Sequence, residues 1–307
     1  MTKWIVVLTV VMLGTTVAVR AQVPRTPPQP PAHRLPDSPE LQVTVEHDVP
    51  YSTIGGRSLG LDIYDLRDHP SDLRPALIML HGGGWTIGSK TDMRELSTFL
   101  VRCCGFVAFA VDYRLTHGSE NLWPAQLDDV QRAVRWIRAH AAKYGVDRDR
   151  IGAYGYSAGG QLVALLGMED ARDNSDPVLA RYSSRVEAVV DVSGPSDFTT
   201  DRDAESDAFL TTFFGGDYEH HSEIWQDASP VFHVSKKAAP FLIVHGTRDA
   251  NVPVTQAQEL ADKLKRARVP VEFVKVDDDH SVASPDALKR LIYETRNFFV
   301  QYLRPGN

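Results

Sequence analysis

The chain has 307 residues, of which 43% are hydrophobic and 24% are charged, and this balance suits a globular protein with a large core. Its formal net charge is −7 and it shows no basic stripe. Nucleic acid and anionic membrane surfaces are therefore excluded as expected partners.

The first 21 residues have the pattern of a secretory signal peptide. Lys3 gives a positive start, residues 4–19 are apolar and Thr-rich, and Val19-Arg20-Ala21 offers small residues at the two positions that a signal peptidase reads. We expect cleavage after Ala21 and a secreted or periplasmic protein without stable membrane association. A membrane anchor is the alternative, although the apolar run is short for the roughly 20 residues of a spanning helix.

Residues 22–40 are rich in proline and predict an extended linker, so the folded domain is expected to cover residues 41–307. The domain begins with two stretches, 41–49 and 59–64, in which apolar and polar residues alternate as in half-buried strands. The turn sequence Ile54-Gly55-Gly56-Arg57 lies between them. Together they predict an antiparallel hairpin at the edge of a sheet.

The rest of the chain alternates apolar strand patterns with amphipathic helix patterns. This order predicts a mostly parallel sheet of about eight strands with helices on both faces. Residues 198–234 are polar and irregular; they are either a small lid or loops with a short helix, and we favour the second. The expected strands are 76–80, 106–111, 151–154, 186–192, 241–244 and 271–276, and the expected helices are 90–102, 124–144, 161–168, 254–267 and one that begins at Ser284-Pro285.

Cys103 and Cys104 are the only cysteines, and they are adjacent. Neighbouring cysteines rarely form a disulfide because the geometry strains the intervening peptide, so we expect two free thiols in a helix, at least one of them buried. The sequence shows no metal-type spacing, no phosphate-binding glycine loop and no nicotinamide fingerprint, and no cofactor is expected.

The pattern Gly155-Tyr156-Ser157-Ala158-Gly159 lies between an apolar strand and a helix-compatible run. A serine there sits on a tight turn that projects its oxygen away from the sheet. The flanking glycines avoid collisions with the neighbouring strand and helix. The following helix directs free N–H groups at the reaction site. Alone the pattern is short enough to arise by chance, so its neighbours decide its meaning.

Three further polar segments follow strands of the same expected sheet. His81-Gly82-Gly83-Gly84 follows one strand, Asp249 follows another, and His280 lies just beyond the last. Ligands of such sheets bind at the carboxyl ends of the parallel strands, where all of these segments meet.

These motifs resemble those of the α/β-hydrolase superfamily, in the hormone-sensitive-lipase-like group of carboxylesterases, and the resemblance covers nearly the whole chain after the leader. The tryptophan after the glycines is similar to that of small secreted feruloyl and acetyl esterases and of formamidases. The order Ser, Asp, His along the chain also matches. The segments that carry the resemblance are His81-Gly-Gly-Gly-Trp-Thr-Ile-Gly88, Val111-Asp-Tyr-Arg-Leu115, Gly155-Tyr-Ser-Ala-Gly-Gly160 and His245-Gly-Thr-Arg-Asp-Ala-Asn-Val-Pro253.

The resemblance implies a catalytic triad and an oxyanion hole. Ser157 would be the nucleophile, His280 the base that activates it, and Asp249 the acid that orients the histidine. The backbone N–H groups of Gly83, Gly84 and Ala158 would bind the oxyanion.

Each of these assignments has an alternative. His280 has Ser281 after it where the family usually has glycine, and a solvated loop histidine is the other interpretation. Asp249 competes with the acidic run 277–279, which we expect to be a solvated loop. Trp85 and Tyr156 either line an aromatic substrate pocket or pack in the core.

Four other polar residues are expected to have structural roles. His81 and His245 lie at strand ends, where they would hold loops by hydrogen bonds. Asp112 and Arg114 are expected to form an ion pair near the site.

The sequence therefore predicts a serine hydrolase that cleaves short-chain or aromatic acyl esters through an acyl-enzyme. Small-molecule or polysaccharide-linked esters, such as acetylated or feruloylated plant polysaccharide, are the expected substrates. An amidase or formamidase and a small serine peptidase are the alternatives within enzymes, and a non-catalytic binding protein on a hydrolase scaffold is the alternative outside them. The sequence does not indicate an oligomeric state.

Overall fold

The computed structural model describes residues 42–67, 72–200 and 203–304. The expected signal peptide and the Pro-rich linker lie outside the described residues, so both stay predictions. Within the described residues, no helix combines the length and the apolar character that crossing a membrane requires.

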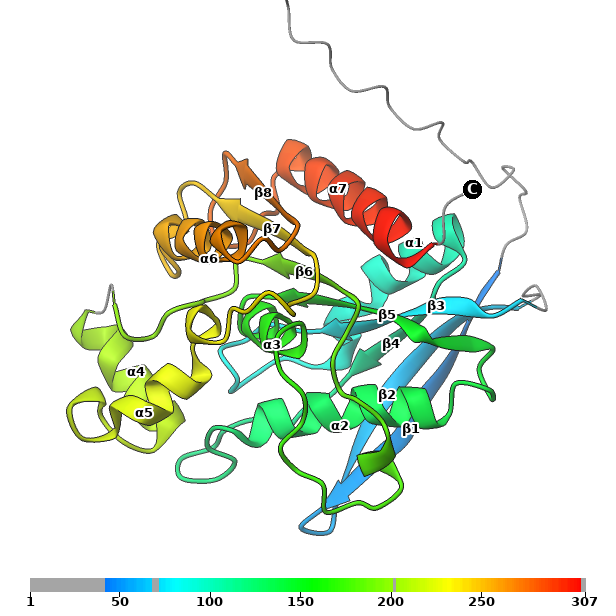
Figure 1. Cartoon of the computed structure of the whole chain (residues 1–307), viewed down its shortest axis with the longest axis horizontal. Coiled ribbons are helices and arrows are strands. Elements are labelled where there is room, and N and C mark those ends of the chain that lie inside the picture. Colours follow the sequence, from blue (N-terminus) through cyan, green and yellow to red (C-terminus); the bar gives the residue numbers. More distant parts are fainter. Residues whose placement is uncertain (1–41, 68–71, 201–202, 305–307) are drawn as a thin grey trace, which may run out of the picture. The chain divides into compact units, whose positions relative to one another are not determined.

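Eight strands form one mixed sheet in the order β1-β2-β4-β3-β5-β6-β7-β8 (Figure 1). The β1–β2 and β2–β4 pairs are antiparallel, and every other neighbouring pair is parallel. The expected mostly parallel sheet with an N-terminal hairpin is confirmed. The strands are β1 Val43–Ile54, β2 Arg57–Leu66, β3 Arg74–Leu80, β4 Val107–Val111, β5 Val146–Tyr156, β6 Ala188–Val192, β7 Phe241–Gly246 and β8 Val271–Val276.

The hairpin turns through Gly55 and Gly56, which have φ angles of 58° and 79°. Two successive residues with positive φ are what a two-residue hairpin turn requires, because that turn matches the twist of the flanking strands. The pairing of Ile54 with Arg57 closes the turn.

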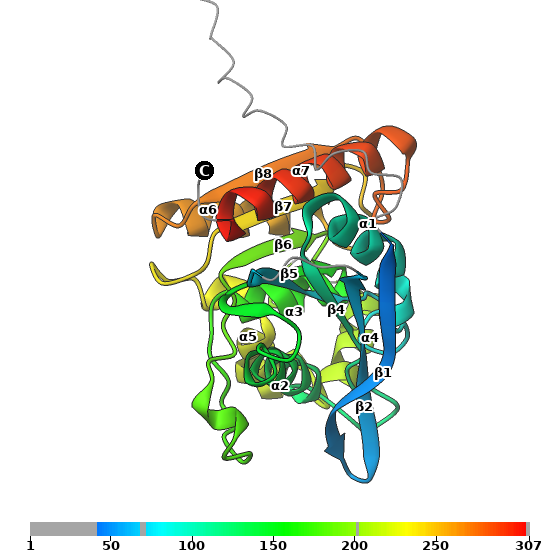
Figure 2. The same cartoon turned by 90° about the vertical axis from the view of Figure 1, so that its right-hand side faces the viewer.

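Helices cover both faces of the sheet (Figures 1 and 2). Helices α2, α3 and α6 pack on one face, and α1 and α7 on the other, each with its own buried apolar cluster. The central strands are consequently buried on both faces, which explains their continuous apolar runs. The α-helices are α1 Arg94–Cys104, α2 Ala125–Ala139, α3 Ala158–Leu166, α4 Ala204–Phe214, α5 Tyr218–Ala228, α6 Val254–Arg266 and α7 Pro285–Leu303, and the short 3₁₀ helices are η1 Lys90–Met93, η2 Leu179–Arg181 and η3 Pro230–Phe232.

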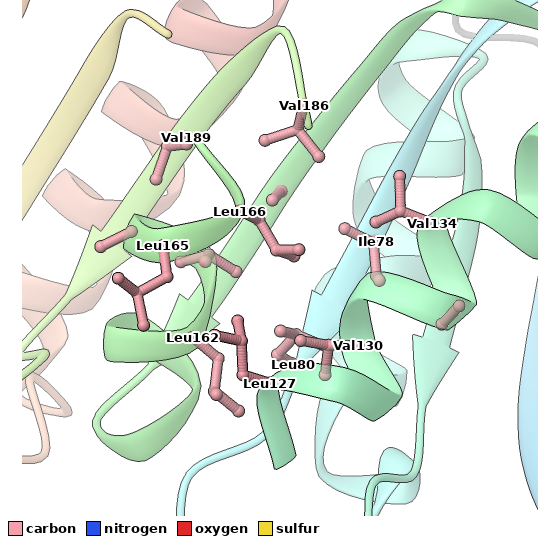
Figure 3. Packing of buried hydrophobic residues seen from close by; sticks show 14 of the residues in the cluster. Ile78, Leu80, Leu127, Val130, Val134, Leu162, Leu165, Leu166, Val186 and Val189 are labelled. Carbon is pink, nitrogen blue, oxygen red and sulfur yellow. The ribbon is translucent and has the colours of Figure 1, made fainter. Parts of the chain in front are cut away.

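The packing around α3 fixes the start of that helix. Its leucines lie between the sheet and α2, and each such buried side chain contributes about 1.5–3 kcal/mol relative to an exposed one (Figure 3). The helix that follows Ser157 is therefore held rigidly on the sheet. The side chains shown in this packing include Ile78 and Leu80 of β3, Leu127, Val130 and Val134 of α2, and Leu162, Leu165 and Leu166 of α3.

The segment 198–234 differs from the expected loops and short helix, because it contains two helices of 11 residues, α4 and α5. Asp203 and Asp217 are their N-caps, and each carboxylate accepts a hydrogen bond from the backbone N–H three residues on. Such caps satisfy N–H groups that the first turn leaves free, so polar residues here favour helices. The two helices lie side by side (Figure 1).

Two other helices differ from their expected bounds. The 90–102 helix begins with a separate 3₁₀ turn, η1, before α1, and the helix expected over 124–144 ends at Ala139. Cys103 and Cys104 end α1 as free thiols, and Cys104 is buried, as expected.

Candidate active site

Ser157 lies between the end of β5 and the start of α3, with φ 54° and ψ −119°. The turn depends on its two glycines. A Cβ atom at Gly155 would lie 2.1 Å from the carbonyl oxygen of Gly159, and a Cβ at Gly159 would lie 2.4 Å from the carbonyl oxygen of Leu80. Only glycine allows the strand and the helix to approach this closely, so the sequence forces the serine into its strained conformation.

His280 lies in the loop between β8 and α7 and contacts Ser157 and Asp249. Its Nε2 is 2.9 Å from Ser157 Oγ, and its Nδ1 is 2.7 Å from Asp249 Oδ2. A carboxylate only accepts hydrogen bonds, so we assign the ring proton to Nδ1. Nε2 is then the acceptor that faces the serine hydroxyl.

Asp249 follows β7, and its side chain is fully buried. Its Oδ1 accepts hydrogen bonds from the N–H groups of Asn251 and Val252, and His245 Nε2 lies 3.1 Å from Oδ2. Burial raises the pKa of Asp249, but the hydrogen bonds from His245, His280 and Val252 outweigh it and hold the pKa well below its usual range. The carboxylate is thus ionised at neutral pH.

The three aspartates directly before His280 bind groups other than the His280 ring. Asp277 pairs with Arg248, Asp278 accepts the N–H of Ser284, and Asp279 accepts the N–H of Ser281. Ser281, which stands where the family usually has glycine, is thus part of the turn beside His280.

Tyr156 and the two strand-end histidines hold loops. Tyr156 Oη donates to the carbonyl oxygen of His280 at 3.2 Å. His81 Nδ1 donates to the carbonyl oxygen of Gly82 at 2.7 Å, and His245 Nε2 donates to that of Val252 at 2.9 Å. The expected roles of His81 and His245 agree with these bonds. The contact of His245 with Asp249 was not foreseen, because four residues separate them on a loop with no regular period.

Residues 81–88, here called the glycine loop, approach the same edge of the sheet. Gly83 has φ 107°, and a Cβ there would lie 2.2 Å from the carbonyl oxygen of Ile87. Gly84 has φ 56°. Within the described residues, the N–H groups of Gly83 and Gly84 donate to no protein acceptor. The N–H of Ala158, in the first turn of α3, has no acceptor within the helix.

Trp85 packs in the core. Its side chain is only 3% exposed and stacks on Phe213 of α4 with ring centroids 4.3 Å apart. Phe209, one turn earlier on α4, is 42% exposed, and a Cβ at Gly84 would lie 3.0 Å from its ring. The exposed aromatic side chain beside the glycine loop is therefore Phe209. Phe209 and Phe213 are four residues apart, so a helix over this segment places both rings on one face.

The ion pair expected between Asp112 and Arg114 is wrong. Arg114 instead binds both carboxylate oxygens of Asp129 in α2, each at 2.8 Å. Asp112 lies 3.3 Å from Lys90 Nζ and accepts the N–H of Lys90. Both residues pair with elements distant in sequence.

The site combines a hydroxyl, an imidazole and an ionised carboxylate in one hydrogen-bonded line, with free N–H groups nearby. The described residues contain no group of three or more His, Cys, Asp or Glu side chains arranged to hold a metal ion. A Ser–His–Asp line of this kind, at the carboxyl edge of an eight-stranded and mostly parallel sheet, is the arrangement of an α/β-hydrolase.

Comparison with known proteins refines this class. Residues 61–264, more than half of the chain, match the model of the BD-FAE family, and the chain belongs to that family. Esterase LipC of Mycobacterium tuberculosis is 33% identical over 210 residues, which cover 67% of this chain and 52% of LipC. The chain thus spans about half the length of this curated relative.

Solved structures match over more of their length. Est2, an esterase of Thermogutta terrifontis with propionate bound, has a TM-score of 0.71 and 28% identity, over 86% of this chain and 97% of Est2. Est2 has also been solved phosphonylated by sarin. A truncated carbohydrate esterase from gut microbiota has a TM-score of 0.72 and 25% identity, over 85% of this chain and 97% of that one.

Proposed function

We propose that the protein is a serine carboxylic-ester hydrolase that acts through an acyl-enzyme. The observation that carries this proposal is the line from Ser157 through His280 to Asp249, with distances of 2.9 and 2.7 Å. The esterase names of LipC and Est2 support the choice of esters as the substrate class.

In the first half of the reaction, Ser157 Oγ attacks the acyl carbon while its proton passes to His280 Nε2. Asp249 stabilises the resulting imidazolium through Nδ1, and its depressed pKa keeps it ionised for this task. The imidazolium then gives the proton to the leaving alkoxide as the C–O bond breaks. A water molecule then attacks the acyl-enzyme while its proton passes to His280 Nε2. His280 returns the proton to Ser157 Oγ as the acyl C–O bond breaks, and the acid is released.

The carbonyl oxygen becomes negatively charged when the serine adds to it. The N–H groups of Gly83, Gly84 and Ala158 are the donors that we assign to this oxyanion. Their lack of protein acceptors supports the assignment, because a donor already in use would not be available to the substrate. Losing one such donor typically costs about 100-fold or more in rate.

The acyl group that we propose is short or aromatic. Two exposed apolar side chains lie here: Ile87, within the glycine loop, is 68% exposed, and Phe209, beside the loop, is 42% exposed. An aromatic acid such as ferulate offers a ring that Phe209 can stack against. Acetylated or feruloylated polysaccharide is the extracellular substrate that this proposal favours, and the carbohydrate esterase neighbour supports it.

Hydrolysis of a 4-nitrophenyl ester series from acetate to palmitate, with methyl ferulate alongside, tests the function. We expect turnover of acetate and butyrate that falls with chain length, and its loss in Ser157→Ala with an unchanged melting temperature. A fluorophosphonate probe should label the wild type and not this variant.

Other outcomes select the alternatives. Full activity in Ser157→Ala would end the proposal. Labelling without turnover of any ester would favour an amidase, a formamidase or a small serine peptidase, and formanilide and peptide anilide substrates would separate them. A protein that neither labels nor turns over substrate would be a binding protein on a hydrolase scaffold.

A further inference from the structure

Gln161 is a fully buried polar side chain on α3, one turn after Ser157. Its own N–H donates to the carbonyl oxygen of Ser157 at 3.2 Å. Its side chain joins two other parts of the chain. Oε1 accepts a hydrogen bond from Trp85 Nε1 at 3.2 Å, and Nε2 donates to the carbonyl oxygen of Ala228, the last residue of α5, at 2.8 Å.

The chemistry of the two partners fixes the orientation of this amide. The indole N–H of Trp85 only donates, and the carbonyl of Ala228 only accepts. A flipped amide would lose both bonds, so Gln161 has one arrangement that satisfies all three groups. Because Trp85 is 3% exposed and Ala228 is fully buried, breaking these bonds would leave buried polar groups without a partner.

Trp85 is itself part of the glycine loop and directly follows Gly84, so its side chain ties the loop to Gln161. Its backbone has φ 59°, a conformation that a non-glycine residue keeps only when its surroundings hold it. Three contacts do so: the bond to Gln161, the stack on Phe213, and the bond from the N–H of Thr116 to the Trp85 carbonyl oxygen at 2.9 Å.

We propose that Gln161 is a positioning residue for catalysis, which acts through Trp85 to hold the N–H groups of Gly83 and Gly84 at a fixed place relative to Ser157. The pair of helices α4 and α5 is the support against which this loop is held, through Phe213 and Ala228. The inference rests on the proposed function.

The expected signature is a loss of transition-state binding without a loss of substrate binding. The oxyanion exists only after the serine has added to the carbonyl, so a displaced loop lowers kcat more than it raises KM. A shift of about 1 Å in a catalytic group typically costs about 100-fold. We expect Gln161→Leu to lower kcat about 10- to 100-fold on 4-nitrophenyl butyrate, with KM within about threefold.

The experiment is a double-mutant cycle of Gln161→Leu and Trp85→Phe. The second variant keeps an aromatic ring but removes the N–H, so it breaks the same bond from the other side. Each protein is assayed for kcat, for KM and for inhibition by a trifluoromethyl ketone, which forms an oxyanion mimic on the serine. Gln131→Leu is the matched control, because Gln131 is also buried but lies in α2 with its Nε2 unpaired.

Non-additive losses support the proposal: the double variant should be no slower than the slower single variant, and ketone affinity should fall in step with kcat. Folded Gln161→Leu with kcat within twofold of wild type would overturn it, as would additive losses, a change in KM alone, or an equal loss in Gln131→Leu. If Gln161→Leu does not fold, Trp85→Phe decides by the same kcat and ketone measurements.

Ser157→Ala is measured in the same series to separate the two hypotheses. An active Ser157→Ala would refute the proposed function itself. An inactive Ser157→Ala beside a fully active Gln161→Leu would refute only the positioning role.

Discussion

Gly83 occupies a backbone conformation and a space that suit no other residue type. Its φ of 107° is strained for any side chain, and a Cβ would lie 2.2 Å from the carbonyl oxygen of Ile87. Gly83→Ala must therefore displace the glycine loop. We expect kcat for 4-nitrophenyl butyrate to fall about 100-fold or more, because an oxyanion donor moves away from Ser157.

Gly55→Ala is the matched control for this change. Gly55 also has a positive φ, 58°, but a Cβ there meets nothing within 4 Å. The control should lose some stability through backbone strain and keep its kcat. Equal kcat values for the two variants would contradict a role of Gly83 in the reaction.

The proximity of the candidate site residues was predictable from the sequence. Ser157, Asp249 and the loop glycines each lie in a short motif at the end of a strand, His280 follows the last strand, and the parallel topology brings strand ends together. The partners of Arg114 and Gln161 were not predictable in the same way. Asp129 and Ala228 are distant in sequence, and only tertiary packing selects them.

Helix α4 brings an exposed aromatic ring, Phe209, to the glycine loop. If that ring contacts the acyl group, Phe209→Ala should lower kcat/KM for 4-nitrophenyl benzoate relative to 4-nitrophenyl acetate by about 10-fold, since a lost apolar contact is worth about that much in specificity. The shared leaving group confines the effect to the acyl side.

Phe99→Ala provides the comparison, because Phe99 is similarly exposed, at 37%, but lies on α1 on the other face of the sheet. It should leave the benzoate-to-acetate ratio unchanged. A ratio that is also unchanged in Phe209→Ala would remove Phe209 from the substrate site.

The strongly patterned elements were predictable and α4 and α5 were not. Buried strands such as β3 and β7 show continuous apolar runs because both of their faces are covered. In α4 the apolar residues gather at its C-terminal end, in Leu210, Phe213 and Phe214, so no stripe runs along the helix. The capping aspartates and the left-handed Gly215 that ends α4 were the available signals.

At the scale of the whole molecule, the alternation of strands and helices was enough to predict the sheet, since parallel strands need crossover helices. Export after cleavage at Ala21 stays a prediction, and N-terminal sequencing of the secreted protein tests it. The sequence pattern did not predict how burial changes the pKa values of Asp249 and Asp191.

Two aspartates near the site make opposite contributions to the pH dependence of folding. Asp249 has a depressed pKa, so it stabilises the fold above the unfolded value near 4, and this contribution is lost as the pH falls through the folded value. Asp191, at 2% exposure in β6, has a raised pKa and therefore makes the opposite contribution to stability. Burial raises its pKa to about 6, although His245 and the N–H of Gly194 oppose the rise. The folded state therefore loses stability as the pH rises from about 4 to 6.

Asp191→Asn should remove this pH-dependent loss of folding stability. Asparagine can keep the bond that Asp191 Oδ1 accepts from the N–H of Gly194 at 3.0 Å, and it carries no charge to bury. Relative to wild type, its unfolding free energy should rise with pH from about 4 and level off above about 7, by on the order of 3 kcal/mol in total, because each pKa unit corresponds to about 1.4 kcal/mol.

Urea unfolding of both proteins at intervals between pH 5 and 8 measures the upper part of this rise, with the exposed Asp149→Asn as the control for removing an aspartate charge at the surface. A difference between Asp191→Asn and wild type that does not change with pH would mean that Asp191 is ionised in the folded state throughout this range. The charge would then be stabilised at its buried position, where Asp191 Oδ1 accepts the N–H of Gly194.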